Sequence, residues 1–328
     1  MAENMTLGLS PCPNDTYIFH ALLHHLVPSP AHFTPHMADV EELNALARQK
    51  KLPVTKLSLG VVPYIMDDYA IMASGAALGW GCGPLVVARE DLPEEKWKTA
   101  RVAVPGLMTT ANLLLTLHGG FQGPREEMLF SDVMDAVLTG EADMGVIIHE
   151  GRFTYADRGL VKLLDLGQWW EATYHAPLPL GAIAVRRDVP VELARAIEAA
   201  ITASVDYANA NPRASAEFIR EHAQELAESV TSAHIKTFVT EYSRDLGETG
   251  RQAIARLVET AAKMQGLRPP ARGGALPVKQ AASGLFVRIR GPRAVMPPGP
   301  FQGRSAGSGP VFASITEHDD QEQILFPQ

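Results

Sequence analysis

The stretch Thr6-Leu7-Gly8-Leu9-Ser10-Pro11-Cys12-Pro13-Asn14-Asp15-Thr16 decides the fold class. Its first four residues are mostly apolar and β-prone, and they predict a short strand. Two prolines then flank a cysteine, and the apolar residues from Tyr17 to Leu26 follow a helical spacing. Asn14 or Asp15 is therefore expected to cap a helix. A strand, a rigid polar loop and a helix N-terminus in succession favour an α/β fold, in which ligands bind at such junctions.

Length, charge and cysteine content exclude several classes of protein. The chain has 328 residues, 46% of them hydrophobic, which is enough for two domain cores. A net charge of −8 without a long basic run argues against a nucleic-acid partner. Cys12 and Cys82 have neither metal nor redox spacing, which fits a reducing compartment. Because the sequence contains no signal peptide and no apolar run of roughly 20 residues, we expect a cytoplasmic protein without a membrane partner.

Strands and helices alternate through the first half of the chain, which predicts parallel sheets covered by helices. The expected strands are 53–58, 85–88, 101–105 and 143–148, and the expected helices are 37–51, 111–117 and 131–138. The second half is helical in pattern, with amphipathic segments at 192–208, 212–222, 229–244 and 251–264.

A similarity between two segments of the sequence suggests how the domains are organised. Residues 83–91 and 178–188 each place a proline before an apolar strand and an arginine-acid turn after it. Two such strands would bracket a domain inserted into another one. The predicted first lobe comprises residues 1–88 and 181–265, and the inserted lobe comprises 89–180. Residues 266–328 are rich in proline and glycine, and we expect a disordered tail with no part in the chemistry.

Polar residues gather at four strand ends, at 10–15, 56–58, 105–111 and His149. In a doubly wound sheet these ends meet at one crevice. Three of them supply hydroxyls and helix-start N–H groups, which suit a carboxylate or another polar oxygen. His149 alone among these groups titrates near neutral pH, so it is the candidate general base. Spacing also leaves open that the hydroxyls only cap helices and that His149 is structural.

Motifs of other chemistries are absent from the sequence. It has no Gly-x-Ser-x-Gly elbow, P-loop, Gly-x-Gly-x-x-Gly or His-Glu-x-x-His. His20, His24 and His25 have helical spacing but no flanking carboxylate or cysteine, so a polar helix face is favoured and no metal site is predicted.

Two long motifs carry a resemblance to a known family. They are Ser-Pro-Cys-Pro-Asn-Asp-Thr-Tyr-Ile-Phe at 10–19 and Gly-Val-Ile-Ile-His-Glu-Gly-Arg-Phe-Thr-Tyr at 145–155. Together they resemble the 1,4-dihydroxy-6-naphthoate synthases of the futalosine route to menaquinone. Shorter supporting segments lie at 54–58, 105–111, 177–181, 234–235 and 242–243. The resemblance runs in order from Leu7 to Met264.

This resemblance implies an α/β fold like that of the type II periplasmic binding proteins, with two lobes and a cleft that closes on the substrate. It implies that His149 is the proton acceptor. It also implies a substrate contact through the segments that contain the following residues: Lys56, Leu57, Ser58, Thr109, Thr110 and Ala111. We add Asn14, from the first motif, as a candidate substrate-binding residue.

The implied reaction converts cyclic dehypoxanthinyl futalosine, a small aromatic carboxylate, into 1,4-dihydroxy-6-naphthoate. It requires removal of a proton and cleavage of a carbon–carbon bond, and aromatisation drives it. The expected enzyme is a lyase that needs no metal, hydride carrier or covalent nucleophile. Cys12, between two prolines before a helix, could have a lowered pKa, but this reaction does not need it, so we interpret it as structural.

Two alternatives remain at this point. One is the chorismate-dehydrating enzyme of the same pathway, against which the His-Glu-Gly-Arg-Phe-Thr-Tyr run argues. The other is a cytoplasmic carboxylate-binding protein without catalysis, which would not need a base at His149. Association into a homo-oligomer stays open.

Overall fold

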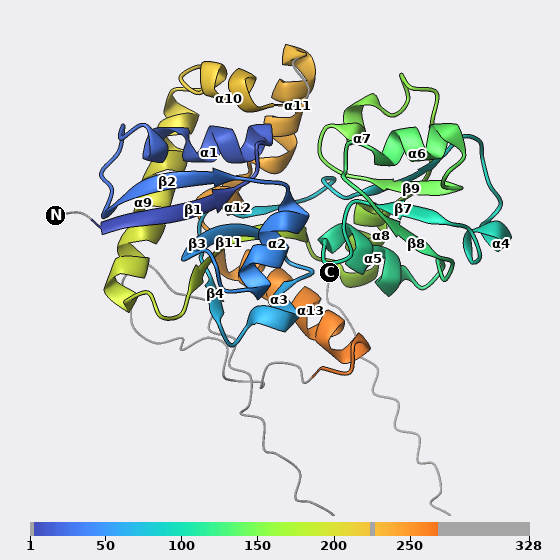
Figure 1. The fold of residues 1–328 in the computed structure, drawn as a ribbon, viewed down its shortest axis with the longest axis horizontal. Helices are drawn as coiled ribbons and strands as arrows, with labels where there is room; N and C mark the ends of the chain where they lie inside the picture. The colour runs from blue at the N-terminus through green and yellow to red at the C-terminus, as the bar shows by residue number, and fades with distance from the viewer. Residues whose placement is uncertain (1–2, 224–226, 268–328) are drawn as a thin grey trace, which may run out of the picture. The chain divides into compact units, whose positions relative to one another are not determined.

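The computed structural model describes residues 3–223 and 227–267, and their strands form two sheets (Figure 1). The first sheet has six strands, in the order β2-β1-β3-β11-β4, and β5 also pairs with β11. Its strands are β1 (Glu3–Leu9), β2 (Ala31–Met37), β3 (Val54–Ser58), β4 (Tyr69–Ile71), β5 (Ala77–Gly79) and β11 (Leu178–Arg186). Strand β1 is parallel to β2 and β3, whereas β11 is antiparallel to β3, β4 and β5.

The second sheet has five strands in the order β10-β6-β9-β7-β8. They are β6 (Leu85–Ala88), β7 (Val102–Val104), β8 (Arg125–Glu127), β9 (Met144–Ile147) and β10 (Val161–Asp165). All of them lie between β5 and β11 in the chain. The two strands with similar sequences, β6 and β11, therefore belong to different sheets. Strand β6 pairs with β9 and β10, whereas β11 pairs in the first sheet. Sheet membership thus changes before Leu85, and the lobe boundaries at 88 and 180 stay a prediction.

The first sheet packs against helices from both ends of the described chain. Helix α1 (Pro13–Leu23) lies along α9 (Val191–Ala210), and these two helices lie beside β1 and β2 in Figure 1. The Ser204 hydroxyl joins them, since it accepts from Leu22 N–H at 3.0 Å and donates to the Ile18 carbonyl at 2.6 Å. The other helices are α2 (Val40–Arg48), α3 (Val62–Ile65), α4 (Glu94–Trp97), α5 (Thr110–His118), α6 (Val133–Thr139), α7 (Gly151–Thr154), α8 (Leu166–Tyr174), α10 (Ala216–His222), α11 (Glu228–Phe238), α12 (Glu241–Arg244) and α13 (Gly247–Met264). None of the described helices is long and apolar enough to cross a bilayer.

Most predicted elements are confirmed, but both sheets are mixed rather than parallel, since β11 is antiparallel to β3 and β6 is antiparallel to β9. Strands β4, β5, β8 and β10 were not predicted, and three further predictions are corrected. Helix α1 begins at Pro13 with Cys12 as its N-cap, so the prediction that Asn14 or Asp15 caps it was wrong. A proline at the first helical position has its φ already set for the helix and needs no N–H partner. Strand β2 was missed, since residues 31–37 alternate only weakly in polarity. The single helix expected over 229–244 is broken between α11 and α12, where Thr240 and Ser243 form a capping box. The predicted tail lies, from residue 268 onward, outside the described residues.

Gly60, which follows β3, allows the backbone there to approach the loop before α5 closely. A Cβ atom built there would lie 2.6 Å from the carbonyl oxygens of Met108 and Thr109. Backbone cannot move aside as a flexible side chain can, so we expect Gly60→Ala to displace the start of α5 and to destabilise the protein by about 1–3 kcal/mol. Urea denaturation measures this, with Gly151→Ala as control, because its nearest contact would be an ordinary 3.4 Å. Equal stability of the two variants would contradict the close approach.

Candidate active site

A cavity of about 700 Å³, the solvent at its mouth included, lies among the strand ends of both sheets. All eight residues predicted to form the site line it: Asn14, Lys56, Leu57, Ser58, Thr109, Thr110, Ala111 and His149. The structure therefore brings the predicted residues together, although they come from four separate segments of the chain.

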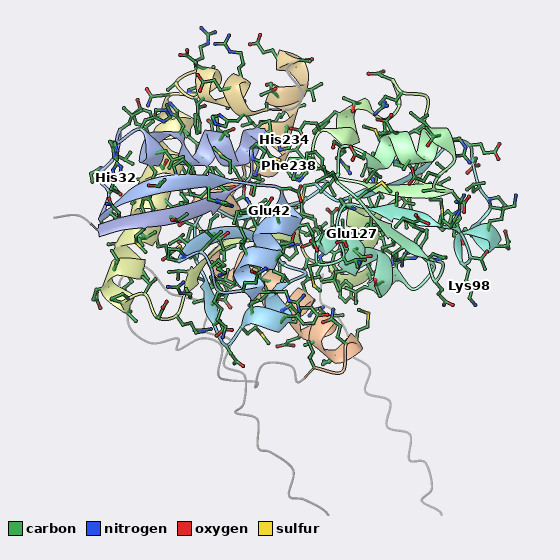
Figure 2. All side chains as sticks on the ribbon, viewed as in Figure 1. His32, Glu42, Lys98, Glu127, His234 and Phe238 are labelled. Atoms are coloured by element: carbon green, nitrogen blue, oxygen red, sulfur yellow. The ribbon has the colours of Figure 1, made fainter. Side chains whose placement is uncertain are left out.

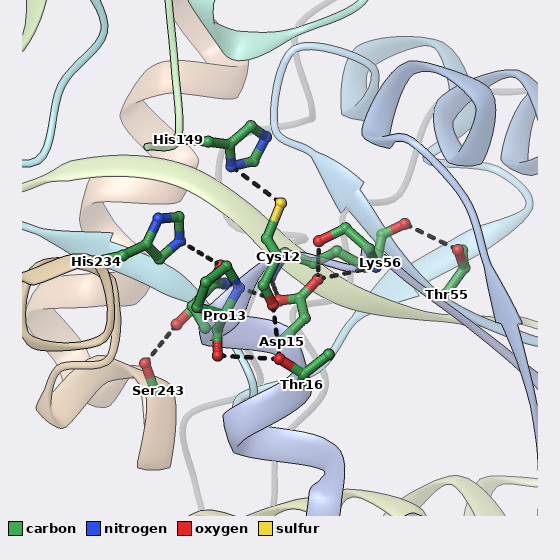
Figure 3. A network of polar contacts seen from close by, with 12 residues as sticks. Cys12, Pro13, Asp15, Thr16, Thr55, Lys56, His149, His234 and Ser243 are labelled. Atoms are coloured by element: carbon green, nitrogen blue, oxygen red, sulfur yellow. Dashed lines mark hydrogen bonds and ion pairs between the residues drawn. The ribbon is translucent and has the colours of Figure 1, made fainter. Parts of the chain in front are cut away.

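A buried carboxylate organises one wall of the cavity (Figure 3). Asp15 is inaccessible to solvent, and its Oδ2 accepts from Ser10 N–H at 3.1 Å and from the Ser10 hydroxyl at 2.8 Å. Its Oδ1 accepts from Asn14 Nδ2 at 2.8 Å and from the Lys56 ammonium. Residues of the first sequence motif thus form a hydrogen-bonded cluster with Lys56 at the start of α1. Asp15 is the centre of this cluster rather than a helix cap.

The Lys56 ammonium forms an ion pair with Asp15 inside this cluster. Its side chain is 7% exposed and that of Asp15 0%, so water screens the pair little. A buried ammonium with a carboxylate partner brings no uncompensated positive charge to the cavity wall. Lys56 is consequently suited to a polar or hydroxyl contact with a ligand and to holding Asp15 and β3 in place.

The N-terminus of α5 forms a second wall. Thr109 is the N-cap and its Oγ1 accepts from Asn112 N–H at 3.2 Å. The Thr110 hydroxyl donates to the Leu180 carbonyl at 2.5 Å and accepts from Gly60 N–H at 3.2 Å. Its hydrogen bonds therefore connect α5 to two other segments of the protein. The N–H groups of Thr110 and Ala111 have no acceptor within the helix, because they lie in its first turn. They are the donors that can bind an anionic oxygen here.

Two polar side chains of α2, which the sequence analysis did not single out, connect these walls. Asn44, which is fully buried, accepts from Ser58 N–H at 2.9 Å and donates to Glu41 Oε2 at 3.0 Å. Glu41 Oε1 in turn accepts from Met108 N–H at 2.8 Å, and burial raises the pKa of this carboxyl. These contacts hold Ser58 in register with the loop before α5. The sequence of α2 shows a clear apolar face but no pattern that marks these two polar residues.

His149 follows the end of β9 and has a left-handed backbone conformation, with a φ of 53°. Its Nδ1 lies 3.4 Å from Sγ of Cys12, and its ring packs edge-on against Phe130 with centroids 4.8 Å apart. Burial, together with the nearby Lys56 ammonium, lowers its pKa to about 4, although Asp15 acts in the opposite direction. The imidazole is therefore neutral at pH 7 and can accept a proton.

Cys12 is a neutral thiol. Burial and the neighbouring Glu150 raise its pKa well above that of a free cysteine, so the lowered pKa considered from the sequence is wrong. The flanking prolines fix the loop but also keep the thiol, 4% exposed, away from water. The interpretation of Cys12 as something other than a nucleophile stands on this burial.

His234 and Phe238, both on α11, lie side by side against this region, with ring centroids 4.6 Å apart (Figure 2). His234 is fully buried, and its Nε2 lies 2.9 Å from Asn14 Oδ1. Burial and the proximity of His149 lower its pKa well below the ordinary value, so it is neutral. Since Asn14 Nδ2 donates to Asp15, Asn14 Oδ1 accepts and His234 Nε2 carries the hydrogen.

Arg152 also lines the cavity, and it holds two segments of the second sheet together. Its guanidinium donates to the Gly83 carbonyl at 2.5 Å and to Asp165 Oδ2 at 2.9 Å. Asp165 Oδ1 caps α8 through the N–H groups of Gly167 and Gln168. Arg152 lies in the second sequence motif, which could have identified it, whereas nothing in the sequence pattern pointed to Gly83.

Comparison with known proteins places these features in a family. A family model described as menaquinone biosynthesis matches residues 5–263. A 1,4-dihydroxy-6-naphthoate synthase from Thermus thermophilus is 47% identical over 268 residues, covering 82% of this chain and 97% of that protein. The enzyme of the same name from Streptomyces coelicolor is 42% identical over 274 residues, covering 82% and 96%.

Solved structures agree on the fold. Protein AF1704 from Archaeoglobus fulgidus has a TM-score of 0.75 at 33% identity, covering 80% of this chain and 98% of that one. The periplasmic aliphatic sulphonate binding protein SsuA from Escherichia coli has a TM-score of 0.56 at 9% identity, covering 81% and 89%. The α/β, periplasmic-binding-protein-like fold class expected from the sequence is thereby confirmed. With a family model that covers most of its length and two relatives above 40% identity, the chain belongs to the menaquinone-biosynthesis family that includes the 1,4-dihydroxy-6-naphthoate synthases.

Proposed function

We propose that this protein converts cyclic dehypoxanthinyl futalosine into 1,4-dihydroxy-6-naphthoate, with His149 as the general base and without a cofactor. The observation that carries the proposal is that His149 and the N-terminus of α5 line one cavity in a chain of this family. The cavity thus offers a proton acceptor and anion-binding donors to a single small molecule. The futalosine derivative has the two matching features, since its aromatic carboxylate is anionic and its fused sugar-derived ring carries the proton to be removed.

The donors of α5 are suited to the carboxylate end of the substrate. The N–H groups of Thr110 and Ala111 point out of the helix start, where the helix dipole favours negative charge by about 0.3–1 kcal/mol for each charge. Asn44 accepts from the Ser58 N–H and so holds the end of β3, which lines the same cavity as the start of α5. Such positioning removes much of the entropic cost of bringing a base and an acidic C–H group together.

The proton would be accepted at Nε2 of His149. In the tautomer that this role requires, the Nδ1 hydrogen is donated to Sγ of Cys12 and the lone pair of Nε2 faces the substrate. Cys12 is then a positioning residue, and the neighbouring Phe130 ring restricts rotation of the imidazole. The electron pair left by the proton then breaks the carbon–carbon bond, the sugar-derived fragment leaves and takes up the proton from His149, and the remaining ring becomes the aromatic naphthoate. A base of this kind contributes about 10²–10⁴-fold, so positioning and exclusion of water supply the rest.

The lowered pKa of His149 has a measurable consequence. We expect kcat/KM to keep its full value down to about pH 5 and to fall as His149 is protonated, with an inflection near pH 4. The sign follows because only the neutral imidazole accepts a proton. The measurement is a pH profile of kcat/KM under conditions where circular dichroism shows the protein folded. An inflection at 6.5, the ordinary pKa of histidine, would contradict the burial of this base.

The function is tested by offering purified protein the futalosine derivative and, separately, the chorismate-derived substrate of the dehydrating enzyme. Chromatography of the products distinguishes the three outcomes. Dihydroxynaphthoate from the first substrate supports the proposal. Turnover of the second substrate alone would assign the chain to the dehydration step, and tight binding without any product would show a binding protein.

A further inference from the structure

The donor atoms of Cys12, His149 and Glu150 form a cluster that the proposed reaction does not use as such. A thiol sulfur, an imidazole nitrogen and a carboxylate oxygen, one from each residue, all lie within 4.8 Å of one another. Cys12 and Glu150 are 4% and 7% exposed. No ligand spacing along the sequence predicts this cluster, because its sulfur and its histidine are 137 residues apart in the chain.

The geometry of the cluster fits a tetrahedral cation. With a Zn–S bond of about 2.3 Å and a Zn–N bond of about 2.05 Å, two such ligands of one zinc ion lie about 3.5 Å apart. Sγ of Cys12 and Nδ1 of His149 are separated by 3.4 Å. A rotation of the Glu150 side chain would bring its carboxylate to the third position. Of the three residues, His149 also lines the cavity of the candidate active site.

The local charges also suit a divalent cation of soft character. Thiolate and imidazole ligands select zinc and its neighbours over magnesium or calcium. The Glu150 carboxylate and the thiolate formed on binding offset the two positive charges of the ion. Lys56, whose ammonium acts on both Cys12 and His149, is already paired with Asp15. His234 Nδ1 is 3.9 Å from Glu150 Oε2, but His234 is neutral and does not act as a counter-ion to Glu150.

We infer that Cys12, His149 and Glu150 bind one thiophilic divalent cation, such as Zn²⁺, and that this ion inhibits the enzyme by occupying its base. On binding, the Cys12 thiol releases its proton to solvent and forms the metal–sulfur bond. The metal takes the Nδ1 lone pair of His149, so the imidazole hydrogen moves to Nε2. The nitrogen that would accept the substrate proton is then blocked. Metal binding and catalysis therefore exclude each other, and this second part rests on the proposed function of His149.

Cobalt(II) provides a direct probe of the site, because a Co²⁺–thiolate bond gives an absorption band in the near ultraviolet that needs no substrate. The full-length protein is titrated with Co²⁺ in a reductant that does not bind metals. We expect the band to saturate at one equivalent and to disappear when Zn²⁺ is added. Cys12→Ser should abolish the band, and Cys82→Ser, which removes the other cysteine, should keep it.

Glu150→Gln tests the third ligand. Loss of even an outer-shell partner costs roughly 10–100-fold in metal affinity, so loss of a direct ligand should weaken Co²⁺ binding by at least about 10-fold. Thermal unfolding of each variant, followed by circular dichroism, shows that it is folded under the titration conditions. A missing band in wild type, or a band that survives in a folded Cys12→Ser variant, would overturn the site.

Inhibition is measured separately. Zn²⁺ should stop product formation over the concentration range in which it displaces Co²⁺, and a chelator should restore the rate. Full activity of the zinc-loaded protein would overturn the exclusion between metal and base. Because the cobalt spectrum requires no turnover, the metal site can be established even if the futalosine derivative is not the substrate, which keeps the two failures distinguishable.

Discussion

Replacing His149 with asparagine is expected to lower kcat by about 10²–10⁴-fold while leaving the substrate dissociation constant nearly unchanged. Asparagine accommodates a positive φ better than most residues, so the backbone at 53° should persist. The groups that we propose to bind the carboxylate, at the start of α5, are untouched. The change therefore removes the proton acceptor and little else.

Single-turnover kinetics and calorimetric binding of the futalosine derivative measure the two quantities. His32→Ala is the control, since His32 is exposed at the surface on β2 and should keep the wild-type rate. If His149→Asn lost affinity and kept its rate once saturated, His149 would be a binding residue and the base would lie elsewhere.

Replacing Asp15 with asparagine should destabilise the protein by about 3–5 kcal/mol, because the buried Lys56 ammonium would lose its counter-ion. The shape of the side chain is retained, so the effect reports on the charge and on the hydrogen bonds that the carboxylate accepts. The same substitution also disturbs the Ser10 and Asn14 contacts, and we expect turnover to fall with it. Denaturation in urea measures the free energy of unfolding.

An exposed ion pair supplies the matched control for this charge effect. Asp206 pairs with Arg244, with both side chains about half exposed, so Asp206→Asn should change stability by no more than about 1 kcal/mol. Adding Lys56→Met to Asp15→Asn should recover part of the lost stability by removing the orphaned charge. Equal effects at Asp15 and Asp206 would show that the buried pair is not the organising element of the site.

Much of the fold and the place of the site could be predicted from local patterns. Strand β3 ends in the cavity residues Lys56 to Ser58, and the end of β9 at Ile147 is followed directly by the cavity residues Ile148 and His149. The convergence of these ends follows from the α/β architecture. What the sequence predicted less well was which atoms remain available for a ligand. The Thr110 hydroxyl, for example, is occupied by Leu180 and Gly60, which are distant in the chain.

Electrostatic states could not be predicted from spacing, because they depend on burial by segments far away in the sequence. The position of Cys12 before a helix start is compatible with a lowered pKa, but enclosure of the thiol and the charge of Glu150 raise it. Asp15 was a candidate helix cap in the sequence. Its contact with Lys56, 41 residues away in the chain, makes it the centre of a hydrogen-bonded cluster instead. The similar sequences of residues 83–91 and 178–188 contain β6 and β11, which are buried strands of different sheets.

The most direct test of the central claim is a side-by-side incubation of wild type and His149→Asn with cyclic dehypoxanthinyl futalosine, in which chromatography follows both substrate and product. We expect wild type to consume the substrate and release 1,4-dihydroxy-6-naphthoate, and the variant to bind the substrate and leave it intact. Equal product from both proteins, or binding by wild type without any product, would contradict the assignment of His149 as the base of a dihydroxynaphthoate-forming enzyme.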